Sequence, residues 1–117
     1  MGKNLTGLVF FSGKILAMKI NLALAQINTK LGDVEANLAK HLDYIEQAKA
    51  AKADLLVFPE LSLTGYVLQD LVASVAHKPT DDDPIFKHLL KASHDLDLVV
   101  GFVDEDSRHR FYIASAY

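Results

Sequence analysis

The 117-residue sequence contains no cysteine. Without a thiol, the chain can form no disulfide, no zinc–thiolate site and no covalent thioester with a substrate. A protein without disulfides suits a reducing compartment, and we predict a cytoplasmic location. Glycine and proline are also scarce, at six and three residues, while half of all residues are apolar. This balance excludes a collagen-like or disordered chain and favours one folded domain.

Long apolar runs and positive charge are scarce as well. No apolar run reaches the roughly 18 residues that cross a bilayer, so we expect no membrane partner. The formal net charge is −3, whereas proteins that bind nucleic acids usually carry a basic field that attracts phosphates. We therefore expect no nucleic-acid partner.

Candidate metal ligands are scattered along the chain. No two of the five histidines have the i, i+4 spacing of a helical metal site; they are His41, His77, His88, His94 and His109. The acidic run at 81–83 could bind calcium weakly, but a turn that leads into a helix, with an aspartate near its positive end, explains it better. We therefore expect neither a metal nor a cofactor.

The first seventeen residues differ from the rest. Their apolar stretch at 8–11 is too short for the apolar region of a signal peptide, and it is broken at 12–14. A more regular pattern opens at Met18. We interpret residues 1–17 as an N-terminal extension and residues 18–117 as a partial domain.

Hydrophobic periodicity predicts an α/β fold. Alternation over 19–27 indicates a strand with both faces covered. Residues 34–52 form the clearest predicted helix, and 55–58 are a continuous apolar run of strand length. This order predicts a parallel β-α-β unit. The predicted helical stripe consists of Val34, Leu38, Leu42, Ile45 and Ala48. Further helices are predicted over 67–76 and 85–94, and further strands over 96–103 and 111–117.

Glu60 is the main candidate for chemistry. It follows the strand at 55–58 directly after Pro59, and binding sites in α/β sheets gather at the carboxyl ends of strands. Partly desolvated by Phe58, Leu61 and Leu63, its carboxylate would suit a general base near neutral pH. The alternatives are a solvated loop glutamate and a residue at the start of a helix.

The segment around Glu60 resembles the carbon–nitrogen hydrolase (nitrilase) superfamily near its catalytic glutamate. It reads Leu-Leu-Val-Phe-Pro-Glu-Leu-Ser-Leu-Thr-Gly-Tyr over 55–66. Three other segments resemble parts of the same family and occur in the same order along the chain. They are 20–27, Gly32-Asp33 with Asn37, and 99–102. Gly65-Tyr66 followed by Asp70-Leu71 is most similar to stand-alone amidohydrolases and to the glutaminase domain of glutamine-dependent NAD synthetases.

This resemblance implies an α-β-β-α sandwich of the nitrilase type, of which the chain holds only the amino-terminal portion. It also implies a Glu–Lys–Cys triad, in which a thiolate attacks an amide or nitrile carbon while the glutamate moves protons. Glu60 matches the glutamate. The family's lysine and cysteine lie beyond anything that corresponds to Tyr117. The strand at 112–116 departs from the family pattern, reading Tyr-Ile-Ala-Ser-Ala in place of a Tyr-Asn-Ser-Ala-like run.

The predicted function is hydrolysis of non-peptide carbon–nitrogen bonds in a small amide or nitrile, by a homo-oligomer. Because this chain has no cysteine, we expect it to be inactive alone. The alternatives are a non-catalytic α/β binding or assembly module and an inert remnant. The enzymatic interpretation requires Glu60 to face a concavity and not open water.

Overall fold

The computed structural model describes residues 2–5, 7–15 and 18–117. These residues form one six-stranded sheet whose strands lie in the order of the sequence. The strands are β1 (Gly2–Leu5), β2 (Leu8–Ile15), β3 (Met18–Ala25), β4 (Leu55–Val57), β5 (Asp97–Glu105) and β6 (Phe111–Ala116). The helical elements are α1 (Val34–Ala50), the 3₁₀ helix η1 (Gln69–Leu71), α2 (Val72–Val75) and α3 (Pro84–Ala92).

The centre of the sheet is parallel, as the sequence predicts. β3 pairs with β4 in parallel, with α1 as the connection between them, and β4 pairs in parallel with β5. The other pairs, β1–β2, β2–β3 and β5–β6, are antiparallel. The carboxyl ends of β3, β4 and β5 therefore lie at one edge, where the loop after β4 carries Glu60.

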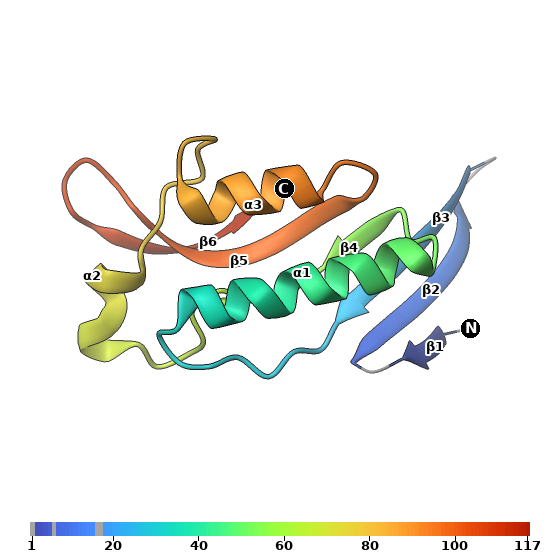
Figure 1. Ribbon diagram of the computed structural model, residues 1–117, viewed down its shortest axis with the longest axis horizontal. Helices are drawn as coiled ribbons and strands as arrows, with labels where there is room; N and C mark the ends of the chain where they lie inside the picture. The colour runs from blue at the N-terminus through green and yellow to red at the C-terminus, as the bar shows by residue number, and fades with distance from the viewer. Residues whose placement is uncertain (1, 6, 16–17) are drawn as a thin grey trace.

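Helices cover one face of this sheet. Figure 1 shows α1 and α3 on the same side of the strands, and the two helices contact each other. Beneath them Ala23, Leu56 and Leu98 are buried, whereas the alternate residues Leu22 and Val57 are only half-buried. In the part of the chain that the structure describes, helices cover only this one face, so the prediction that both faces of the first parallel strand are covered stays a prediction.

Helix α1 differs from the prediction at one position of its buried stripe. The stripe contains His41, which is 0% exposed, while Leu42 is half-buried. A buried helical stripe alternates steps of four and three residues, and 34, 38, 41, 45 and 48 follow that rule. The predicted stripe contains the apolar Leu42 in place of the neighbouring His41.

The N-terminal segment belongs to the sheet. β2 pairs with β3 along its whole length, from Leu8 opposite Ala25 to Ile15 opposite Met18. Leu8 is 1% exposed, and the hydroxyl of Ser12 donates to the Asn21 side chain at 2.7 Å. Residues 1, 6, 16 and 17 of the predicted extension lie outside the described residues, and the boundary at Met18 stays a prediction.

The acidic run at 81–83 leads into α3. The carboxylate of Asp83 caps this helix by accepting from the backbone N–H of Ile85 and Phe86 at 2.9 and 3.0 Å. It also lies 2.8 Å from Nδ1 of His77. Helix capping therefore accounts for an aspartate here. The predicted helix over 67–76 is shorter, consisting of η1 and α2.

None of the helices in the described ranges combines the length and the apolar character that crossing a bilayer requires.

Candidate active site

A tight turn presents Glu60 at the carboxyl end of β4. The ladder with β5 extends to Phe58, whose N–H donates to the carbonyl of Val99 at 2.8 Å, and Pro59 then ends the pairing. The carbonyl of Leu61 accepts from the N–H groups of Thr64 and Gly65 at 3.1 and 2.8 Å. The turn is therefore closed directly after Glu60.

Glu60 lines a hollow of about 330 Å³ at this edge of the sheet. Glu60 itself is exposed, so the expected partial desolvation by Phe58, Leu61 and Leu63 is wrong: all three belong to the buried core. The hollow nonetheless provides the concavity that the enzymatic interpretation requires. Its other lining residues are Phe58, Pro59, Val99, Gly101, Ile113, Ala114 and Ser115.

Tyr66 lies close to the same carboxylate. Loss of water, and then the charge and hydrogen bonding of Glu60, raise the pKa of the Tyr66 hydroxyl. The tyrosine therefore keeps its proton at neutral pH and can donate a hydrogen bond to Glu60. Tyr66 is 52% exposed, so this contact remains accessible to water.

Gly101 in β5 lets the turn lie against the sheet. A Cβ at this position would fall 2.5 Å from the backbone N of Leu61, 2.6 Å from the carbonyl O of Pro59 and 3.0 Å from the carbonyl C of Glu60. All three are backbone atoms, which cannot rotate away. The place of Glu60 therefore depends on a residue without a side chain about forty positions later in the chain.

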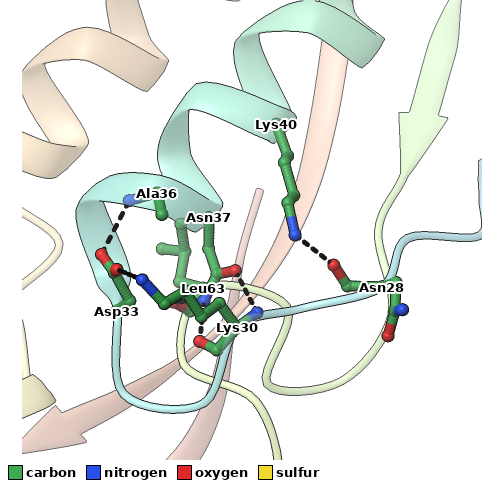
Figure 2. A network of polar contacts seen from close by, with 7 residues as sticks. All are labelled: Asn28, Lys30, Asp33, Ala36, Asn37, Lys40 and Leu63. Atoms are coloured by element: carbon green, nitrogen blue, oxygen red, sulfur yellow. Dashed lines mark hydrogen bonds and ion pairs between the residues drawn. The ribbon is translucent and has the colours of Figure 1, made fainter.

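Asn37 ties the turn to α1. Its amide nitrogen donates to the carbonyls of Leu63 and Lys30 at 2.9 and 2.8 Å, and its amide oxygen accepts from the Lys30 N–H at 2.7 Å. Figure 2 shows Asn37 on the helix between these two loops. Because Asn37 is 0% exposed, these bonds replace water for three backbone groups.

His41 and Ser62 form a second link, which was not predicted from the sequence. Both residues are 0% exposed, and Nε2 of His41 lies 2.9 Å from the Ser62 hydroxyl. Burial is the main cause that lowers the pKa of His41 to about 4, so the imidazole is neutral at pH 7. The helical spacing of position 41 was the available signal for its burial, but nothing local indicates Ser62 as its partner.

The described residues contain no group of three histidine, aspartate or glutamate side chains placed to hold a metal ion. Of the described residues that line the hollow, Glu60 alone carries a titratable group. Fold and site together define an α/β sheet that carries a carboxylate at the carboxyl end of a parallel strand.

The comparisons with known proteins identify the family. The carbon–nitrogen hydrolase family model matches residues 21–114. The chain is 38% identical over 93 residues to the glutamine-dependent NAD⁺ synthetase of Thermotoga maritima, which covers 75% of this chain and 16% of that enzyme. The chain belongs to the carbon–nitrogen hydrolase family, as the resemblance around Glu60 predicts.

Solved structures agree with this assignment. Glutamine-dependent NAD⁺ synthetase from Acinetobacter baumannii, solved with ADP, has a TM-score of 0.61 and 32% identity, covering 81% of this chain and 18% of that one. An N-terminal amidase has a TM-score of 0.67 at 22% identity, covering 80% of this chain and 23% of that one, and supports the fold alone. The predicted fold class is confirmed: the chain forms an α/β portion of the nitrilase fold.

Proposed function

We propose that Glu60 is the proton-transferring carboxylate of a hydrolase that cleaves non-peptide carbon–nitrogen bonds in small amides or nitriles. The observation that carries the proposal is the turn that presents Glu60 at a hollow, at the carboxyl end of β4. The family match over 21–114 includes this turn. The chain spans 16% and 17% of the length of two curated relatives, so the remaining groups of the site are expected on further polypeptide.

For an amide substrate, the proposed role of Glu60 is to carry one proton from the thiol to the leaving nitrogen, and later one proton from water back to the sulfur. Glu60 takes the proton of a cysteine thiol as the sulfur bonds to the amide carbon. It returns that proton to the nitrogen as the carbon–nitrogen bond breaks and ammonia or an amine leaves. Water then attacks the thioester and passes a proton back through Glu60 to the sulfur. A lysine stabilises the negative oxygen that forms in each step.

The thiol must come from outside these 117 residues, which contain no cysteine. We expect the lysine to lie there as well. We therefore expect no hydrolysis by the isolated chain. The cytoplasmic location and the assembly into a homo-oligomer remain predictions.

A hybrid enzyme tests the proposal. The segment of the Thermotoga maritima synthetase that aligns with this chain is replaced by the sequence of this chain, and glutamine-dependent NAD⁺ formation is measured. We expect activity in the hybrid and a loss of about 100-fold or more in kcat for Glu60→Gln, the usual contribution of a positioned acid–base group. Glu46→Gln, an exposed position on α1, is the matched control.

Thermal unfolding of each hybrid shows whether it is folded. A folded parent hybrid without activity would refute the proposed function, and full activity in the Glu60→Gln hybrid would refute the role of Glu60.

A further inference from the structure

We propose that His41 is a positioning residue for Glu60, acting through the buried hydroxyl of Ser62. The inference rests on the proposed function, because it assigns to α1 the task of fixing the turn that carries the catalytic carboxylate. His41 touches neither the hollow nor Glu60, so its effect on chemistry is indirect.

The turn needs external support. Leu61, the residue after Glu60, has a φ of +50°, in the left-handed region that costs a residue with a side chain about 1 kcal/mol or more. A strained conformation persists only where the surroundings hold it. The N–H of Leu63 donates to the carbonyl of Gly101 at 3.1 Å, but this bond lies beyond the strained residue.

Ser62 holds the turn between a helix and a strand. Its hydroxyl oxygen accepts from the N–H of Gly101 at 3.2 Å and lies 2.9 Å from Nε2 of His41. These contacts join α1, the turn and β5 at one buried atom, two residues from Glu60. Among the described residues, no buried side-chain nitrogen or oxygen lacks a hydrogen-bond partner.

The environment of His41 fixes the direction of these bonds. Nδ1 lies 2.7 Å from the carbonyl of Asn37, which can only accept, so Nδ1 carries the ring proton. In the neutral ring Nε2 is then an acceptor, and the Ser62 hydroxyl donates to it. The imidazole also stacks on Phe58, with ring centroids 4.1 Å apart and planes at 28°. His41 therefore contacts residues on both sides of Glu60 in the sequence.

The acceptor at Nε2 is the property to test. His41→Leu removes it and leaves the Ser62 hydroxyl only the longer bond to the carbonyl of Gly101, 3.4 Å away, whereas the side-chain amide oxygen of His41→Gln can accept in its place. Ser62→Ala removes the donor from the other side. The matched controls are the exposed positions His88→Leu on α3 and Ser74→Ala on α2.

The first measurement is amide hydrogen exchange in the 117-residue chain. We expect His41→Leu and Ser62→Ala to lose protection at the N–H groups of Leu63 and Gly65, while the amides of α3 keep theirs. His41→Gln restores protection in the turn. Protection in the turn that is unchanged in both His41→Leu and Ser62→Ala would overturn the inference, as would equal loss in the turn and in α3.

The second measurement is the kinetics of the hybrid enzyme. A displaced catalytic group costs up to about 100-fold in rate, so we expect kcat to fall about 10- to 100-fold in Ser62→Ala and His41→Leu, with KM nearly unchanged and recovery in His41→Gln. If Glu60→Gln abolishes activity but a folded Ser62→Ala hybrid keeps its kcat, positioning by His41 is wrong and the proposed function stands. If Glu60→Gln keeps activity, the proposed function fails.

Discussion

Acid should destabilise this protein through His41 well before its carboxylates are protonated. Burial lowers the pKa of His41 from its ordinary value of 6.5 to about 4 in the folded chain. Between these two pH values the unfolded chain binds a proton that the folded chain excludes, so the free energy of unfolding falls as the pH falls. The loss begins near pH 6.5 and is complete below pH 4.

The gap between the two pKa values corresponds to about 3 kcal/mol, of which about 2 kcal/mol is already lost at pH 5. This is a large share of the 5–15 kcal/mol that typically stabilises a domain. Urea unfolding followed by far-UV circular dichroism, at intervals from pH 7.5 to 5.0, measures the change. This range stays above the ordinary pKa values of aspartate and glutamate.

Two variants separate His41 from the other groups that titrate. His41→Gln cannot take up the proton, and we expect its stability to change little over this range, although it starts lower at pH 7.5. His88→Gln removes an exposed histidine and should keep the full loss. An equal loss in the parent chain and in His41→Gln, or a loss of less than about 0.5 kcal/mol in the parent, would contradict the burial argument.

Three further changes test other contacts. Gly101→Ala should destabilise the chain by about 1–3 kcal/mol or more in urea unfolding, because the new methyl group meets fixed backbone atoms; an unchanged midpoint would show that the turn can shift. Asn37→Ala should cost about 1–3 kcal/mol by leaving backbone groups of Lys30 and Leu63 unpaired, and Asn37→Asp should cost more because its carboxylate faces two carbonyls. A chain that starts at Met18 should aggregate on size exclusion, since the edge of β3 becomes unpaired; a stable monomer would show that β2 is dispensable.

Local patterns were enough to predict most of the fold. The strands around Leu22, Leu56 and Val100 and the helices α1 and α3 follow from periodicity and capping, which depend on neighbouring residues. The strands β1 and β2 were not predicted, because their places are set by pairing of β1 with β2 and of β2 with β3 and not by an alternating pattern of their own.

The site was predicted only in part. The position of Glu60 after a strand and a proline pointed to the carboxyl edge of the sheet, and the hollow lies there. The exposure of Glu60 agrees with one of the open alternatives, a solvated loop glutamate. The sequence could not select that alternative, because the choice depends on how the residues beside Glu60 divide between core and surface. The pair of His41 and Ser62 is separated by 21 positions, and a contact across that distance leaves no local pattern.

The close approach of Gly101 to the turn bears on protein engineering. Grafting the Phe-Pro-Glu loop alone onto another sheet would transfer the glutamate without the contacts that fix its position. The portable unit has three parts: the loop, a helix that brings an asparagine and a histidine to its underside, and a neighbouring strand with a glycine at the crossing point. In a scaffold with a larger residue at that crossing point, the side chain would clash with the loop backbone, whatever the loop sequence.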